Sequence, residues 1–204
     1  MALLSQSVGL TRYRVAEEIP GSLWQQVPAL LKKNAFRDID ATTDERSFGW
    51  TSFDDMLDTG FTAAPPEKGH YLAFALRLET RRIPPAVFKK HLAIALRDEL
   101  AKAKEQGRSF VSRDRKREIK EQVGLRLRAK TLPVPAVFDA VWDMRSGRVL
   151  LASTNAKVRA LFEDYFGLTF GLKLEPLVPF FLALDILGED AAGTLEGLEP
   201  AIFV

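Results

Sequence analysis

The 204-residue sequence contains no cysteine, so it can form neither disulfide bonds nor a thiolate site. It also lacks any apolar run long enough to cross a bilayer, because its most apolar stretch, residues 177–187, is interrupted by Pro179 and Asp185. No segment repeats at a period typical of solenoids. Residues 1–10 have no basic start followed by an apolar run, so we expect no signal peptide. These absences favour a globular protein of the reducing cytoplasm.

Acidic side chains are scarce in one part of the sequence. Residues 77–130 contain 17 Lys+Arg and 7 Asp+Glu, a local net charge of +10. The rest of the chain holds 12 Lys+Arg and 20 Asp+Glu, so the overall net charge of +2 conceals a strong asymmetry. Concentrated positive charge attracts polyanions, whereas evenly mixed charge mainly keeps a protein soluble. We therefore expect the basic segment to contact a polyanion, and DNA is our first choice.

Hydrophobic periodicity predicts strands at both ends of the sequence and long helices in the middle. Residues 7–15, 47–51 and 70–80 are expected strands, and residues 21–33 an expected helix. Two long helices are expected over residues 84–106 and 113–130, ended by Gly107 and Pro133. Later elements are a strand hairpin that turns at 145–147, a helix from 155 to 166 ended by Gly167, a strand at 169–174 and a helix at 179–187. The residues after Gly188 are expected to be poorly ordered.

These elements predict an α+β fold. A mixed or antiparallel sheet, formed from both ends of the chain, is expected to be covered by helices, with the pair of long basic helices between its parts. The strand at 70–80 is apolar on both sides and should be central. The predicted parts are an N-terminal strand–helix–strand part (1–80), a basic helical insertion (81–135), a strand-hairpin–helix–strand part (136–188) and an acidic tail (189–204).

Each long helix has an apolar face and a basic face when drawn on a helical wheel. On the first, Phe88, Leu92 and Leu96 share one side, while Lys90, Arg97 and Lys104 lie opposite. On the second, one narrow sector contains Arg113, Arg117, Lys120, Gly124 and Arg128. A glycine within a helix costs roughly 1 kcal/mol relative to alanine. On a basic face it allows a phosphate to approach the backbone closely.

Other interpretations of the charged residues remain open. Basic stripes on helices are often simply solvated, and Glu105, Glu118 and Glu121 are available to pair with them. Membrane binding is less favoured, because no Trp/Phe/Leu edge adjoins the stripes. The acidic residues between 38 and 58 would have to be held near a phosphate to form a nuclease site, whereas a polar loop favours simple solvation. The scattered Trp24, Trp50 and Trp142 are more typical of a core than of a base-stacking surface.

Six short segments together resemble the recombination-associated protein RdgC family, over most of the chain from about residue 8 to residue 179. They are VGLTRYR at 8–14, FGW at 48–50, IPPAVFK at 83–89, EQGR at 105–108, VWD at 141–143 and LEPL at 174–177. Their order and spacing make the resemblance specific. It implies a non-catalytic protein, without cofactor or metal ion, that forms a ring-shaped homodimer around duplex DNA. RdgC proteins bind DNA with little sequence preference and limit the loading of RecA recombinase.

The resemblance also identifies a DNA-binding region. Family members are longer, and this chain stops near the point where their C-terminal third begins, so part of the dimer contact is expected to be missing. We thus expect a nucleoid-associated, non-specific binder of double-stranded DNA. The alternatives are a protein-interaction module on the same fold and, less favoured, a nuclease. The candidate DNA-binding residues, from the helical wheels and the resemblance, are Lys89, Lys90, Arg97, Lys104, Arg108, Arg113, Arg117, Lys120 and Arg128.

Overall fold

The computed structural model describes residue 3 and residues 5–199. Contacts between backbone positions divide the chain into two compact units. We call them the sheet unit (Met1–Ala35, Trp50–Leu76 and Phe138–Val204) and the helical unit (Phe36–Gly49 and Arg77–Val137). The sequence assigns residues 36–49 to an N-terminal part, but in the structure they group with the basic helices. The four-part division made from the sequence otherwise stays a prediction.

The α+β class expected from the sequence is confirmed, and within the described residues the strands form one seven-stranded sheet. The strand order is β2-β4-β5-β6-β1-β7, and β3 pairs with β4 outside this path. β1 is antiparallel to both β6 and β7, and β5 is antiparallel to β6. β4 lies between β2 and β5, as its two apolar sides predicted. The strands are β1 (Thr11–Val15), β2 (Arg46–Ser52), β3 (Glu67–Lys68), β4 (Tyr71–Thr80), β5 (Val134–Asp143), β6 (Arg148–Leu151) and β7 (Leu174–Pro176).

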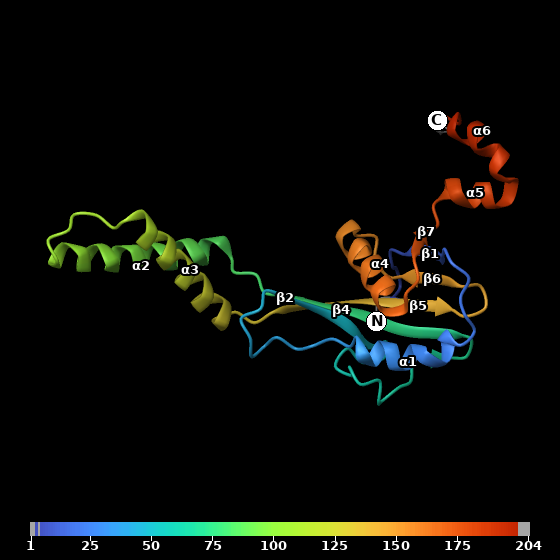
Figure 1. Cartoon of the computed structure of the whole chain (residues 1–204), viewed down its shortest axis with the longest axis horizontal. Helices are drawn as coiled ribbons and strands as arrows, with labels where there is room; N and C mark the ends of the chain where they lie inside the picture. The colour runs from blue at the N-terminus through green and yellow to red at the C-terminus, as the bar shows by residue number, and fades with distance from the viewer. Residues whose placement is uncertain (1–2, 4, 200–204) are drawn as a thin grey trace. The chain divides into compact units, whose positions relative to one another are not determined.

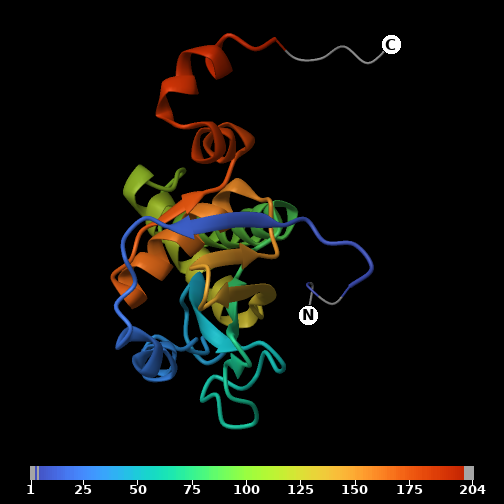
Figure 2. The same ribbon diagram turned by 90° about the vertical axis from the view of Figure 1, so that its right-hand side faces the viewer.

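In the sheet unit, α1 (Leu23–Lys33) and α4 (Ala156–Phe170) lie side by side over one face of the sheet (Figures 1 and 2). Their apolar side chains join those of the strands in one buried cluster. Trp50 is fully buried there, edge-on to Phe74 with ring centroids 5.1 Å apart, and its Nε1 donates a hydrogen bond to Thr169 Oγ1 at 2.8 Å. The sheet unit therefore has a thick aromatic core.

Two expectations for the later part of the chain are wrong. α4 continues through Gly167 and ends at Gly171, which adopts a left-handed φ of +71°. The strand expected at 169–174 is therefore absent, and only Leu174–Pro176 is extended. Packing explains the difference, because the buried Phe166 and Phe170 continue the helical stripe beyond Gly167. The first strand is also shorter than expected and begins at Thr11.

The end of the described chain is helical. α5 (Pro179–Leu187) is followed by the 3-10 turn η1 (Glu189–Ala191) and by α6 (Ala192–Glu196). The poorly ordered tail expected after Gly188 is thus partly wrong, although residues 200–204 lie outside the described residues. Arg14 on β1 donates to Asp185 Oδ1 of α5 at 2.8 Å. Among the described residues, no helix is both long and apolar enough to cross a membrane.

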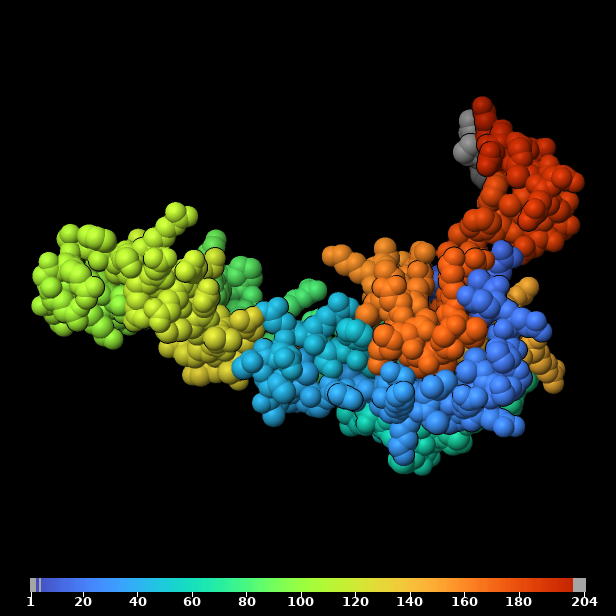
Figure 3. Space-filling view, in the orientation of Figure 1, coloured from blue at the N-terminus to red at the C-terminus, as the bar shows by residue number. Residues whose placement is uncertain are grey.

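The helical unit is built on α2 (Pro85–Glu105) and α3 (Arg113–Lys130), at the bounds that the sequence predicted to within a residue or two. Figure 1 shows α3 running back along α2, and Figure 3 shows the side chains of the two helices packed together. Gly107, with φ +76°, follows α2, and Ser112 Oγ caps α3 by accepting from the Arg115 amide at 3.3 Å. The buried residues between them are Ala103, Ile119, Val123 and Leu127.

Candidate nucleic-acid interface

The apolar faces of α2 and α3 meet each other, which leaves the basic faces on the surface. Phe88, Leu92 and Leu96 of α2 are partly buried against Ile119, Val123 and Leu127 of α3. On the opposite face of α2, Lys90, Arg97 and Lys104 are exposed. The helical wheels therefore had the correct orientation. The other candidate residues that are exposed are Lys89, Arg108, Arg113, Arg117 and Lys120.

Three of the candidate residues come together at one hollow in the helical unit. Arg117, Lys120 and Arg128 of α3 line a hollow of about 430 Å³, with Gly124 between them. Phe88 and Ile83 form its apolar part, and Glu121 and Glu45 also reach it. The remaining candidates, Lys89, Lys90, Arg97, Lys104, Arg108 and Arg113, do not line this hollow. The structure thus brings one cluster together and leaves the other basic residues distributed along the helices.

Arg128 differs from the other candidates because it is partly buried, and it is paired with a residue far from it along the chain. Its Nη1 forms an ion pair with Oε1 of Glu45, which lies in the segment before β2. Glu45 was not predicted from the sequence, since 83 residues separate it from Arg128. An acidic residue that lies near a basic cluster only through the fold leaves no periodic signal in the sequence.

Arg81 fixes the segment that carries Glu45. Its side chain is buried and donates to the carbonyl oxygens of Ile39 at 2.9 Å and Thr42 at 2.6 Å. Its backbone amide donates to the Glu45 carbonyl oxygen at 2.8 Å. A buried guanidinium requires several acceptors to offset its lost hydration. Arg81 is therefore a structural residue that holds Glu45 in place, although it belongs to the basic segment.

Arg115 also belongs to the basic segment, but its guanidinium is paired with acidic side chains. Its Nε and Nη2 donate to the two carboxylate oxygens of Glu99 at 2.7 Å and 3.2 Å, and its Nη1 donates to Glu118 Oε2 at 2.8 Å. These hydrogen bonds raise the pKa of Arg115, and those to Glu99 lower the pKa of that carboxyl. Arg115 thus joins α2 to α3. Glu118 pairs with Arg115, which is outside the predicted basic stripes.

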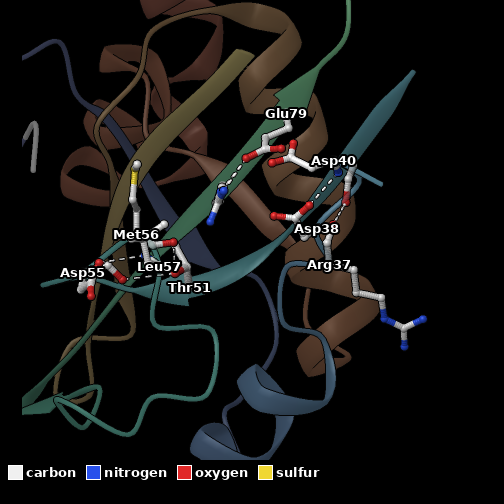
Figure 4. Close-up of polar contacts among 10 residues, drawn as sticks. Arg37, Asp38, Asp40, Thr51, Asp55, Met56, Leu57 and Glu79 are labelled. Carbon is white, nitrogen blue, oxygen red and sulfur yellow. Dashed lines mark hydrogen bonds and ion pairs between the residues drawn. The ribbon is translucent and has the colours of Figure 1, made fainter. Parts of the chain in front are cut away.

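Several of the acidic residues between 38 and 58 accept local hydrogen bonds, and Figure 4 shows those of Asp38 and Asp55. Asp38 Oδ1 accepts from the Asp40 amide at 2.6 Å, and Asp55 Oδ1 accepts from the Leu57 amide at 2.8 Å. Asp58 accepts from the amides of Ala63, Thr62 and Gly60, which together lower its pKa. Within residues 3 and 5–199, no group of three such side chains is placed to hold a metal ion.

Glu79 is also drawn in Figure 4, and its charge is matched by a neighbouring arginine. Its Oε1 accepts from Arg77 Nε at 3.0 Å, and both side chains are buried. The Arg77 guanidinium also lies over the Phe36 ring, 4.2 Å from its centroid. Both residues lie on β4, and the arrangement is typical of a buried ion pair within one strand rather than of a carboxylate that binds a metal ion.

The tryptophans do not form a base-stacking surface. Trp50 and Trp142 are fully buried, and Trp24 packs edge-on against Trp142 with ring centroids 4.7 Å apart. His70 packs against the ring of Tyr71 at 3.9 Å. The interpretation of the tryptophans as core residues is therefore confirmed, and the basic side chains remain as the groups suited to a polyanion.

One protein family matches the part of the chain that contains these features. Residues 9–176 match the family described as "Putative exonuclease, RdgC". The chain belongs to this family. The resemblance seen in the six short segments is thereby confirmed, and at the family level it points to a recombination-associated, DNA-binding protein of the nucleoid. A comparison with curated proteins gives no match.

Proposed function

We propose that this RdgC-family chain binds double-stranded DNA without sequence preference through the exposed basic faces of α2 and α3. The observation that supports this most directly is the cluster of Arg117, Lys120 and Arg128 at one hollow, since it combines three cations in a unit of high positive charge. The helical unit contains 19 Lys+Arg and 11 Asp+Glu, a net charge of +8. Contacts to phosphates supply affinity but carry no sequence information.

The wider proposal follows the family. The chain acts without catalysis, as a homodimeric clamp or barrier on nucleoid DNA that limits RecA filaments. It needs no cofactor for this, because counterion release on phosphate binding supplies the free energy. The family description includes exonuclease activity, so incubation of an end-labelled duplex with Mg²⁺ or Mn²⁺ is an essential control. We expect the strands to keep their full length, and progressive shortening would contradict the non-catalytic proposal.

Charge reversal on α3 tests DNA binding. Arg117→Glu combined with Lys120→Glu replaces two attractive contacts by two repulsive ones, so affinity should fall at least about tenfold for every duplex sequence alike. The measurement is fluorescence anisotropy at low salt, with circular dichroism to confirm folding. A matched control, Arg145→Glu with Arg148→Glu, makes the same change of charge at two exposed residues, one in the β5–β6 turn and one at the start of β6. Superimposable curves for the two double variants would show that α3 does not contact DNA.

Salt dependence gives a second test of the same proposal. If about four to six phosphates are neutralised, log K should fall against log salt with a slope of roughly −4 to −5. Several duplexes of different sequence should give the same slope and the same affinity. An affinity that does not change with salt, or a strong preference for one duplex, would contradict binding through the basic faces.

A protein-interaction module is the second candidate, and one observation favours it. The helical unit exposes large apolar side chains on both helices and at the connection between them: Val87, Ile94, Phe110 and Leu125. Exposed apolar side chains are the groups that a partner protein would cover. This candidate predicts that Ile94→Ser with Leu125→Ser leaves DNA affinity unchanged and abolishes a protein contact, which sedimentation at increasing concentration would detect for self-association.

A further inference from the structure

We propose that the hollow at Gly124 is a binding site for one phosphate group, and that the Glu45 carboxylate pairs with Arg128 of the hollow when no phosphate is bound. This inference rests on the proposed DNA binding and deepens it, because it assigns one subsite and one competing residue. The phosphate can belong to the DNA backbone or to a free phosphate compound. Both present the same tetrahedral group of anionic oxygens to the hollow.

The shape of the hollow is the first argument. Gly124 lies between Lys120 and Arg128, one helical turn from each, so all three share one side of α3. A Cβ atom added at Gly124 would lie 3.8 Å from Phe88 Cε2 and 3.9 Å from Arg128 Nη2. These are ordinary contact distances, so a methyl group fits there without displacing any neighbour. The same space, beside a guanidinium nitrogen, suits a phosphate oxygen instead.

The charges around the hollow are the second argument. Arg117 and Arg128 each present a planar fork of donors, which matches two oxygens of a phosphate, and Lys120 adds a point charge. Within residues 5–199, the ion-pair partner of Arg117 is Asp114, at 3.5 Å, in a pair that is largely exposed. Exposed pairs of this kind contribute little free energy, so a phosphate can replace the carboxylate.

The Glu45 carboxylate competes with a phosphate for Arg128. It pairs with Arg128, and the Glu45 side chain is 67% exposed whereas that of Arg128 is 27% exposed. Because Arg81 holds the Glu45 backbone through the amide hydrogen bond of 2.8 Å, the carboxylate returns to the same place whenever the phosphate leaves. One guanidinium cannot serve the carboxylate and a phosphate fully at the same time. Glu45 therefore lowers the apparent affinity of the hollow.

Two variants test the site from opposite directions. Gly124→Ala fills the space without changing any charge, so affinity for a duplex should fall roughly threefold or more. Alanine also favours the helix, so the loss cannot result from unfolding. Glu45→Gln removes the competitor and should raise affinity up to about fivefold. The matched control is Glu105→Gln, which makes the same change of charge near the far end of α2, roughly 26 Å along the helix from Phe88.

The expected result is a loss for Gly124→Ala, a gain for Glu45→Gln and a clearly smaller gain for Glu105→Gln in duplex anisotropy at low salt. Equal gains for the two acidic variants, with no loss for Gly124→Ala, would overturn the phosphate site and leave the proposed DNA binding intact. In that case the duplex is held by the distributed basic residues.

A second measurement uses inorganic phosphate alone, observed through the backbone amide signals of α3 in the folded full chain. Saturable shifts at Gly124 and Lys120, weakened by Gly124→Ala, would support the site even if the wild-type protein fails to bind a duplex. That outcome would assign the hollow to free phosphate compounds and reject the proposed function. The absence of such shifts, together with unchanged duplex binding by Gly124→Ala, would reject the site.

Discussion

The two units of this protein are stabilised in different ways. The sheet unit buries large aromatic side chains from its strands and from α4, including Trp50, Trp142 and Phe162, and each of these is fully buried. The core of the α2–α3 pair contains three buried branched aliphatic residues from α3, and the facing side chains of α2, such as Leu92, are only partly buried. A pair of helices has only one mutual face, so its core cannot become thick.

Because their cores differ, the two units are expected to contribute differently to stability and to the proposed binding. A thin core leaves most of each helix in contact with solvent, and the helical unit uses that surface for charge. Ion pairs such as Arg115 with Glu99 then join the helices where apolar contact is limited. We infer that the sheet unit holds the fold and that the helical unit carries the binding surface. Variants in the two units should accordingly differ in both size and kind of effect.

The largest effect is expected in the aromatic core of the sheet unit. Trp50→Ala removes a fully buried ring and leaves Thr169 Oγ1 without its donor, so unfolding free energy should fall by about 3–5 kcal/mol. Urea denaturation followed by the fluorescence of Trp24 and Trp142 would measure it. Trp50→Phe, which keeps an apolar ring, is the control and should lower the unfolding free energy by less. A change below about 1 kcal/mol would show that the ring is not part of a tight core.

A smaller effect is expected in the α2–α3 pair. Ile119→Ala deletes a buried side chain and should cost about 2–3 kcal/mol, at the lower end for such changes because the surrounding core is thin. Leu92→Ala should cost less, since Leu92 is only partly buried. Amide hydrogen exchange would locate the effect in α2 and α3. Equal loss of protection in the sheet unit would mean that the two units unfold as one, which would remove the distinction drawn above.

The sequence predicted the regular parts of both units well, for identifiable physical reasons. The bounds of α2 and α3 follow from Pro85, Gly107 and Ser112, whose backbone and capping preferences are local. The central position of β4 followed from its two apolar sides. Such features are determined by neighbours along the chain, and so a single sequence contains them.

Features determined by contacts between distant residues were not predicted. Gly167 suggested a helix end, but packing of Phe166 and Phe170 in the core carries α4 to Gly171. The stripe of Arg117, Lys120 and Arg128 was predicted, whereas the Glu45 partner and the Arg81 clamp were not. Whether a basic residue serves the fold, as Arg81 and Arg115 do, depends on which carbonyl and carboxylate oxygens the fold brings near it. Periodicity along a helix does not contain that information.

The basic face of α2 should contribute still less to stability. Arg97 is exposed, on the side opposite Leu92, so Arg97→Ala should change the unfolding free energy by no more than about 0.5 kcal/mol. The same variant should reduce affinity for every duplex, because it removes one phosphate contact. Urea denaturation and anisotropy on one protein sample would compare the two effects. A large loss of stability with unchanged DNA affinity would reverse the roles assigned to the two faces of the helix.

The smallest effect concerns the pair that joins the two helices. Hydrogen bonds from Arg115 lower the pKa of Glu99, and the positive charges of Lys102 and Arg108 act in the same direction. A lowered pKa means that the pair stabilises the folded helices above the pKa that Glu99 has in the unfolded chain. That contribution is lost as pH falls through the lower pKa of the folded state. Both side chains remain partly exposed to solvent, which screens the pair, so the change in stability should be slight.

Carboxyl chemical shifts followed by NMR from pH 7 to pH 2 would measure the titration of Glu99 directly. We expect its midpoint to lie below the ordinary value of a glutamate, and Arg115→Gln to move it upward, because the main hydrogen-bond donor is then lost. Lys102→Gln is the control, since it removes a nearby charge but no hydrogen bond to Glu99, and it should move the midpoint less. Equal shifts in both variants would mean that general charge, rather than the Arg115 contact, controls Glu99. The α2–α3 pair would then depend chiefly on its thin apolar core, and the Arg115 contact would contribute little to it.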